Sequence, residues 1–197
     1  VALWAAFQIR AGQTLAFGPT RTGARCYLCV RGGIAVPLFL GSASTHILSG
    51  LGGFSGRALR KGDTLAIGDS SMDFQQRSVA PAALQRLAPR KTLRVTSAPQ
   101  ESWFAESALS RFYQGTYRVS EESNRMGLRL EGPEVQTERQ HQMITEPVAL
   151  GAIQIPAGGQ PIILFVEQQT TGGYPKIANV ISADLSSVGQ LRPRDEI

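Results

Sequence analysis

The stretch of sequence that decides the fold is a nine-residue unit that occurs twice, as Arg10-Ala-Gly-Gln-Thr-Leu-Ala-Phe-Gly18 and as Arg60-Lys-Gly-Asp-Thr-Leu-Ala-Ile-Gly68. The two copies share six of nine residues and begin 50 positions apart. In each copy a turn at glycine precedes an alternating stretch, such as 64–67, with the period of two that is typical of a half-buried strand. A third segment, at 191–197, resembles the unit more loosely. A repeated turn and strand favours a barrel-like β architecture, because two copies are too few for a solenoid or a propeller.

The composition also favours β structure. The 197 residues are 42% hydrophobic and 18% charged, which excludes a disordered polyelectrolyte, and 21 Gly with 11 Pro favour short strands over long helices. One helix is expected between Ser102 and Tyr113, where apolar residues recur at helical spacing and Ser102 is the predicted N-cap. We therefore predict an all-β fold with a minor helix, with further strands at 25–30, 93–96, 116–119, 126–130, 152–155, 161–166 and 177–182.

The chain is expected to contain two domains. Pro81, Pro89 and Pro99, together with a basic run, interrupt the regular pattern, so we predict a first domain at 1–90 and a second at 91–197. Residues 1–100 hold 12 Lys and Arg against 3 Asp and Glu, whereas residues 101–197 hold 8 against 12. This asymmetry fits two subdomains that dock, a basic face for an anionic ligand or an acidic partner, or a chance distribution of solvated charge.

Several classes of protein are excluded or unsupported. The apolar stretches are far shorter than the about 18 residues of a membrane helix, and no nucleic-acid-binding motif accompanies the sequence pI of about 9.7. We expect neither a membrane nor a nucleic acid as partner. We expect the first residues not to be a secretory signal, and two cysteines exclude a multi-bridge framework, so a cytoplasmic location is expected. A P-loop motif for ATP is also missing.

The cysteines, histidines and serines give no site. Cys26 and Cys29 form a C-x-x-C within a predicted strand, where they would point to opposite faces. His46 and His141 have no carboxylate pattern beside them, so no metal site is expected. The glycine-rich loops at 41–46 and 53–57 do not fit a nucleophile elbow, because Arg57 occupies the last glycine position of the second.

The strongest local candidate for a binding site is the polar loop 167–176, Glu-Gln-Gln-Thr-Thr-Gly-Gly-Tyr-Pro-Lys, between two apolar strands. Its amides donate and accept, its glycines let backbone N–H groups approach a ligand, and Lys176 offsets a carboxylate charge. Gln154 and Gln160 add two amides nearby. The pattern suits a small planar polar ligand, and the alternative is a glycine-rich hairpin whose polar side chains are simply solvated.

Several long motifs in order resemble the biotin-dependent carboxyltransferase family. They cover nearly the whole chain and lie at 32–37, 40–45, 50–53, 56–59, 62–63, 123–132, 151–156, 159–162, 169–176 and 190–193. The family includes a subunit of bacterial ATP-dependent 5-oxoprolinase, proteins labelled allophanate hydrolase subunit two, the carboxyltransferase subdomains A and B of urea carboxylase, and the antagonist of a sporulation kinase inhibitor.

The resemblance implies two cyclophilin-like β-barrel subdomains and a cognate partner subunit of related fold. It implies a subunit of a heteromeric amidohydrolase that opens the lactam 5-oxoproline with ATP, which is used at the level of the complex. An alternative is a carboxyltransferase that moves carboxylate from carboxybiotin to urea, with biotin carried on another domain. A further alternative is a non-enzymatic regulator that sequesters its partner. One fold with one pocket is compatible with all three.

The resemblance and the polar loop together name the site residues for a small planar amide substrate. Tyr174 and Lys176 are the catalytic candidates, provided that burial shifts their pKa values. The substrate-binding candidates are Gln154, Gln160, Gln169, Thr170, Gly172, Gly173, Asn124, Arg125 and Arg57. The last three are polar residues in family motifs, and their alternative role is to fix loops by hydrogen bonds.

The sequence departs from the family pattern in three ways. Ala43 replaces a usual Arg and Arg194 replaces a usual Gly, which puts a contact and a turn in doubt. The N-terminal section of the family is not present, so the first subdomain is expected to be incomplete at its N-terminus. We expect this chain to be a fragment that is inactive alone.

Overall fold

The computed structural model describes residues 3–71, 73–139 and 143–197, which form two compact units. Unit 1 comprises Val1–Gln13 and Cys26–Ser78, and unit 2 comprises Thr14–Arg25 and Val79–Ile197. The units therefore divide between Ser78 and Val79, with one early segment in unit 2. The two cyclophilin-like subdomains at 1–90 and 91–197 stay a prediction.

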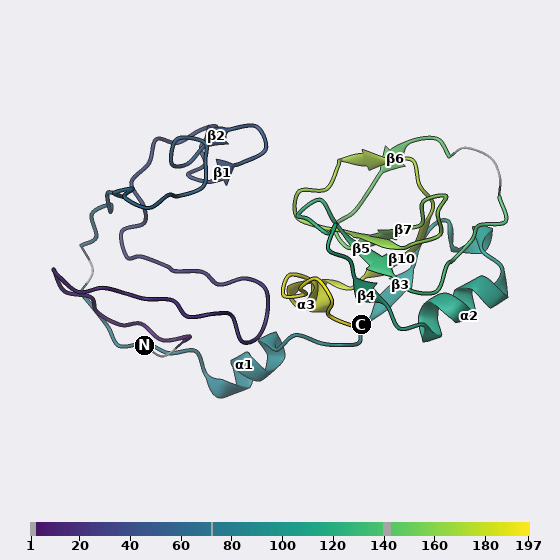
Figure 1. Cartoon of the computed structure of the whole chain (residues 1–197), viewed down its shortest axis with the longest axis horizontal. Helices are drawn as coiled ribbons and strands as arrows, with labels where there is room; N and C mark the ends of the chain where they lie inside the picture. The colour runs from purple at the N-terminus through teal and green to yellow at the C-terminus, as the bar shows by residue number, and fades with distance from the viewer. Residues whose placement is uncertain (1–2, 72, 140–142) are drawn as a thin grey trace. The chain divides into compact units, whose positions relative to one another are not determined.

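Unit 2 is built on a six-stranded antiparallel sheet (Figure 1). Neighbouring strands follow the order β3 (Val95–Ser97), β10 (Lys176–Val180), β7 (Ala152–Gln154), β8 (Ile162–Leu164), β5 (Gly127–Glu131) and β4 (Arg118–Val119). A second, two-stranded sheet joins β6 (Glu146–Pro147) to β9 (Thr171–Gly172). The predicted mainly β fold is confirmed, whereas closure of the sheet into a barrel stays a prediction.

The core of unit 2 forms where apolar side chains of the sheet meet a helix. Ile153 and Ile163 face each other across β7 and β8, and both are buried. Helix α2 (Glu106–Gln114) adds Ala108 and Phe112 to the same cluster. Burying this apolar surface is the main stabilising contribution to unit 2. Other buried members include Phe104, Tyr117, Val119, Leu128, Leu130, Val135, Phe165, Ile177, Val180 and Val188.

The helices differ from the sequence prediction in number and in capping. A 3-10 turn, η1 (Glu101–Trp103), precedes α2, whose N-cap is Ala105, so the N-cap prediction at Ser102 is wrong. The prediction also missed α1 (Pro81–Leu87), η2 (Ser182–Asp184) and α3 (Leu185–Val188). Pro81 begins α1, because its fixed φ suits a first helical turn that needs no N–H donor. None of the helices in the described ranges is long and apolar enough to cross a membrane.

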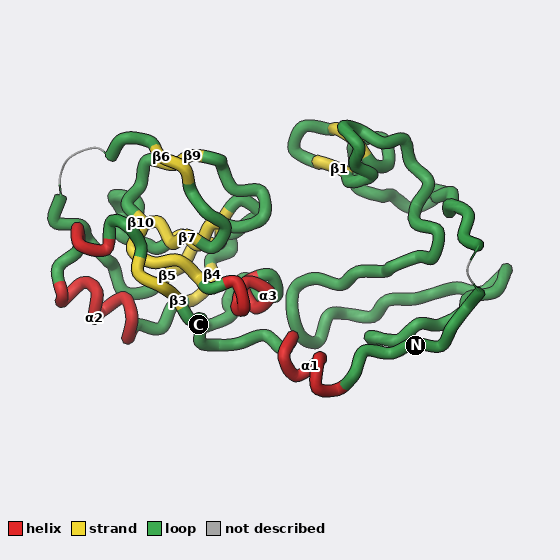
Figure 2. The backbone as a smooth tube through the Cα atoms, turned by 180° about the vertical axis from the view of Figure 1, so that it is seen from behind, coloured by secondary structure: helices red, strands yellow, loops and turns green. Residues whose placement is uncertain are grey.

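Unit 1 consists almost entirely of loops and turns (Figure 2). Its strands, β1 (Thr45–His46) and β2 (Leu51–Gly52), are two residues long. Isolated bridges join Ala5 to Ser78 and Ile34 to Ile67. Of the predicted strands, 25–30 is not formed, and 64–67 is represented only by the bridge at Ile67.

The repeated sequence unit corresponds to a repeated turn. The backbone N–H of Arg10 donates to the Gln13 side chain at 2.8 Å, and that of Arg60 donates to Asp63 at 2.6 Å. The third residue of each turn is left-handed, with φ +82° at Gly12 and +92° at Gly62. Glycine adopts this conformation without steric cost.

The third segment, at 191–197, forms the same turn. The N–H of Arg192 donates to Asp195 Oδ2 at 2.8 Å, and Arg194 takes the left-handed position with φ +74°. The replacement of a usual Gly by Arg194 put this turn in doubt. The turn nevertheless forms, with Arg194 in a backbone conformation that favours glycine.

Candidate functional site

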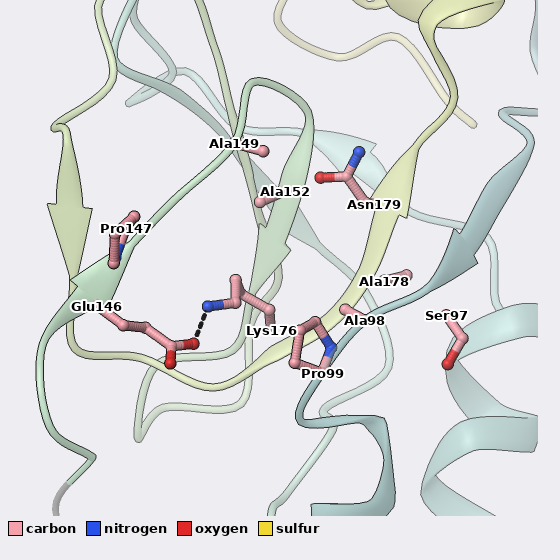
Figure 3. A pocket seen from close by; sticks show the side chains of 10 residues that line it. All are labelled: Ser97, Ala98, Pro99, Glu146, Pro147, Ala149, Ala152, Lys176, Ala178 and Asn179. Carbon is pink, nitrogen blue, oxygen red and sulfur yellow. Dashed lines mark hydrogen bonds and ion pairs between the residues drawn. The ribbon is translucent and has the colours of Figure 1, made fainter.

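A half-open pocket of about 400 Å³ lies in unit 2 beside β3, β6, β7 and β10 (Figure 3). Small apolar side chains, all Ala or Pro, make up most of its wall. The charged residues on the wall are Glu146 and Lys176, and the polar side chains beside them are Ser97 and Asn179. The pocket therefore presents one ion pair to a small ligand against an apolar surface.

Lys176 and Glu146 point toward one another in this pocket (Figure 3). Lys176 is the first residue of β10 and its side chain is only 8% exposed, whereas Glu146 on β6 is 38% exposed. The Lys176 Nζ donates a hydrogen bond to Glu146 Oε1. This hydrogen bond holds the pKa of Glu146 below its ordinary value, so the side chain is a carboxylate at neutral pH.

Gln100 completes the ion pair from a third segment. Its Nε2 donates to Glu146 Oε1 at 2.8 Å, and its Oε1 accepts from the backbone N–H of Lys176 at 3.3 Å. Gln100 is buried, at 7% exposure. One buried amide therefore connects the carboxylate on β6 to the backbone of β10.

All three members of this network lie beside a proline in the sequence. Pro99 precedes Gln100, Pro147 follows Glu146, and Pro175 precedes Lys176. Proline fixes its own φ and restricts the residue before it to extended conformations. The restriction on a preceding residue therefore applies to Glu146, whereas beside Gln100 and Lys176 the fixed φ is that of the proline itself.

A second group of amides lies next to Lys176. Gln154 on β7 pairs in register with Lys176 and is 1% exposed. Its Nε2 donates to the Tyr174 carbonyl at 3.3 Å, and its Oε1 accepts from Gln169 Nε2 at 3.4 Å. A Cβ on Gly172 would lie 2.6 Å from the same Nε2, so only glycine allows this approach. The structure thus brings Gln154, Gln169, Gly172 and Lys176 together.

The rest of the polar loop is placed less deeply. The Tyr174 side chain is half exposed, Thr170 is exposed, and Gly173 lies between Gly172 and Tyr174. The Thr170 carbonyl accepts from the Val148 N–H at 3.1 Å. Gln168 donates to the Val148 carbonyl at 3.2 Å, and its Oε1 is buried without a hydrogen-bond donor in the described part of the chain.

Three of the predicted binding residues in unit 2 make other contacts. Gln160 donates to and accepts from the backbone of Gly132, at 3.2 and 3.1 Å, and lines a second pocket of about 310 Å³. Asn124 Oδ1 accepts from the N–H of Met126 at 2.8 Å. Arg125 Nε donates to Glu167 Oε1 at 2.6 Å and ties its own loop to the start of the polar loop.

Arg57 lies in unit 1, where it holds a turn. Its guanidinium donates to both oxygens of Asp63 at 2.8 Å and lies over the Phe54 ring at 5.2 Å. The hydrogen bond from Arg57 lowers the pKa of Asp63 to about 2. These contacts match the loop-fixing alternative that the sequence left open.

Gln100 and Glu146 are two site residues that the sequence patterns did not predict. They are 46 positions apart and belong to no motif, so the adjacent prolines are the single local signal that they share. Elsewhere, no group of three or more His, Cys, Asp or Glu within the described ranges could hold a metal ion. Cys26 and Cys29 are exposed free thiols, and His141 lies outside the described residues.

Comparisons with known proteins identify the family of the chain. The family described as "Carboxyltransferase domain, subdomain A and B" matches residues 1–197. The chain is 36% identical to a 5-oxoprolinase subunit of Haemophilus influenzae, over 94% of this chain and 59% of that protein. It is also 36% identical to the corresponding 5-oxoprolinase subunit of Escherichia coli, over 96% and 61%. The chain thus spans about three fifths of the length of these relatives.

Among solved structures, urea amidolyase of Kluyveromyces lactis superposes with a TM-score of 0.77 at 33% identity. The match covers 90% of this chain and 12% of that one. Sequence and fold therefore agree over nearly the whole chain. The chain belongs to the carboxyltransferase family of subdomains A and B.

Proposed function

We propose that this chain is part of a heteromeric 5-oxoprolinase, in which it binds the small planar amide whose ring is opened to glutamate with ATP hydrolysis. The observation that carries the proposal is the Lys176–Glu146 ion pair, with Lys176 nearly buried and Glu146 partly exposed, in a pocket whose wall is mostly Ala and Pro. The names of the two bacterial relatives support it. The cognate partner subunit of related fold is part of the same proposal.

The chemistry of the pocket suits a lactam. The Ala and Pro side chains pack against a small ring, while Lys176 and Glu146 offer a donor and an acceptor on the same wall. Gln154, Gln169 and Gly172 hold the strand that carries Lys176. Tyr174, Thr170 and Gly173 are proposed as the more exposed contacts at the loop, and Tyr174 and Lys176 remain the catalytic candidates.

ATP is proposed to bind elsewhere in the complex. The sequence holds no G-x-x-x-x-G-K-[ST] motif to cradle phosphates. What we assign to this chain is therefore to hold and orient the amide and to exclude water from it.

The similarity to urea amidolyase supports a second candidate, carboxyl transfer to urea. Urea and the ureido ring of biotin are planar amides, so the donor and acceptor of the same pocket fit them too. Carboxybiotin, delivered on another domain, would supply the carboxyl group. The residues proposed to hold urea are again Lys176 and Glu146.

The test is ATP-dependent turnover of 5-oxoproline by the full-length protein, reconstituted with the subunits encoded beside it. We expect turnover only when this protein is present, and at least a tenfold loss in Lys176→Met, because the pocket loses its cation. Tyr174→Phe tests the second catalytic candidate. Lys61→Met, which removes a lysine from a turn of unit 1, is the matched control and should retain full activity.

Two other outcomes would redirect the proposal. Transfer of carboxylate from carboxybiotin to urea, without lactam turnover, would replace the amidohydrolase by the carboxyltransferase. Tight binding of the partner without either reaction would favour the regulator.

A further inference from the structure

We infer that Glu146 and Lys176 form a clamp that selects cis amides, with Glu146 Oε2 accepting the amide N–H, Lys176 Nζ donating to the amide carbonyl, and Gln100 acting as a positioning residue. The inference rests on the proposed amide-binding function of the pocket. It goes beyond that function because it names the acceptor, the positioning residue and the geometry of amide that is selected.

The two carboxylate oxygens of Glu146 are used unequally. Lys176 and Gln100 both donate to Glu146 Oε1. No donor from the described parts of the chain reaches Oε2, although the residue lines the pocket and is 38% exposed. A carboxylate oxygen held in place by its neighbour and open to a pocket is an acceptor ready for a ligand N–H.

The ammonium group of Lys176 lies beside this carboxylate. Lys176 Nζ carries three N–H donors, and the bond to Glu146 Oε1 uses one of them. Its side chain is nearly buried, so water competes weakly for the remaining donors. A charged donor therefore lies next to a charged acceptor on one wall of the pocket.

The Glu146–Lys176 pair limits the shape of the amide that can bind to both residues at once. In a lactam or in urea, an N–H and the C=O lie on the same side of the C–N bond, so both can meet one donor–acceptor pair. In an open-chain secondary amide the trans form is strongly preferred, and the two groups point in opposite directions. A trans amide can therefore satisfy only half of the clamp.

Gln100 fixes the clamp through its two amide ends. It spans from the Lys176 backbone to Glu146, is itself buried, and follows Pro99. Without it, Glu146 would lose the hydrogen bond that keeps Oε1 turned inward. Gln100 has no place on the pocket wall, so it acts through Glu146 rather than on the ligand.

The test is a binding series on the full-length protein, measured by ligand-observed NMR titration with three probes: 2-pyrrolidinone, N-methyl-2-pyrrolidinone and N-methylacetamide. We expect 2-pyrrolidinone to bind at least tenfold more tightly than either of the others, since N-methylation removes the N–H and the open-chain amide is trans. Equal affinity for 2-pyrrolidinone and its N-methyl form, or no binding of 2-pyrrolidinone, would overturn the clamp.

Variants of Glu146 and Gln100 test the role of each residue in binding. In Glu146→Gln, Lys176 and Gln100 hold the amide oxygen, so an NH₂ group replaces Oε2 and repels the ligand N–H. The ratio between 2-pyrrolidinone and its N-methyl form should then fall to about one. Glu131→Gln, which changes an exposed carboxylate paired with Arg118, should leave the ratio unchanged.

Gln100→Ala should lower the same ratio at least threefold, because Glu146 is no longer fixed. A variant that weakens both ligands equally would show a merely structural role and would overturn the assignment of Gln100. Thermal melting of each variant establishes that the fold is intact. Because the series needs neither ATP nor a partner, discrimination without turnover would contradict the proposed function alone, and turnover without discrimination would contradict the clamp alone.

Discussion

Unit 2 buries its apolar side chains, whereas unit 1 exposes them. In the described part of the chain, every buried large hydrophobic residue lies between Phe104 and Leu191, in unit 2. In unit 1, Leu40 is 92% exposed and Tyr27 is 77% exposed. Unit 1 instead relies on turns, short backbone pairings and the Arg57–Asp63 pair. Apolar residues therefore stabilise a unit only where the chain supplies a second layer to cover them.

The largest expected effect of this difference is on amide hydrogen exchange. We expect β7 and β10 to exchange at least about a thousandfold more slowly than the turns of unit 1, because the core strands open only with global unfolding. Exchange followed by NMR or mass spectrometry measures this directly. Similar protection in β1 and β2 would show that unit 1 has a core of its own.

Truncation of one isoleucine in each unit tests the same contrast. Ile177, which is fully buried, should cost about 3 kcal/mol of unfolding free energy when changed to Ala, because the change leaves a cavity. Ile67 is 58% exposed, and Ile67→Ala should stay within about 0.5 kcal/mol. Urea denaturation gives both values. Comparable losses would contradict the difference between the units.

Each unit also contains an aspartate paired with an arginine. In unit 2, Arg94 donates to Asp184 at 2.7 Å and lowers the pKa of this buried group to about 2. The bond joins residues 90 positions apart, whereas Arg57 and Asp63 are six apart. Asp184→Asn should therefore destabilise unit 2 by about 2 kcal/mol at pH 7, since the buried carboxylate loses the charge that strengthens its hydrogen bonds from Arg94 and its ion pair with Arg90. Asp63→Asn should lower the free energy of unfolding by less than Asp184→Asn does.

The contribution of Asp184 to the stability of unit 2 depends on pH. The folded pKa of Asp184 lies below the unfolded value of 3.8, so its contribution is complete above about pH 4 and is lost as the pH falls toward 2. The difference between the native protein and Asp184→Asn should disappear over that range in denaturation curves. A difference that persists at pH 2 would mean that the charge is not the cause.

The smallest effect is expected at a type of turn that occurs in both units, at Arg10 and Arg60 in unit 1 and at Arg192 in unit 2. Arg194→Gly should stabilise unit 2 by about 1 kcal/mol, because glycine removes the strain at φ +74°. The change also removes an exposed bond to Glu121, which contributes little. Glu121→Gln is the control for that bond, and thermal melting measures both. A lower melting temperature in Arg194→Gly would show that the turn depends on the arginine.

Much of unit 2 could be predicted from its sequence, and much of unit 1 could not. The alternating pattern at 126–130, the apolar run at 161–166 and the largely apolar segment 152–155 predicted β5, β8 and β7, because each strand lies in a sheet with a buried face. The stretch 25–30 has similar composition but finds no neighbouring strand, so it stays irregular. Strand formation needs a partner that local sequence does not reveal.

The candidate site divides in the same way. The polar loop predicted Gln169, Gly172 and Lys176, and the upstream segment added Gln154; the structure brings these four residues together. It did not predict that Gln160 would bind the Gly132 backbone instead, or that Glu146 would face Lys176. The difference arises because a motif fixes residue types along one segment, whereas a hydrogen bond depends on which segments the sheet brings into contact.

By itself, the sequence determined the turns at Arg10 and Arg60, the family to which the chain belongs, and the amides of the polar loop. These follow from interactions within a few residues or from motifs read in order. Only the tertiary structure decided that Gln100, Glu146 and Lys176 meet, across separations of 46, 76 and 30 positions. The physical reason is that burial and antiparallel pairing, rather than chain proximity, bring the nearly buried Lys176 next to the partly exposed Glu146.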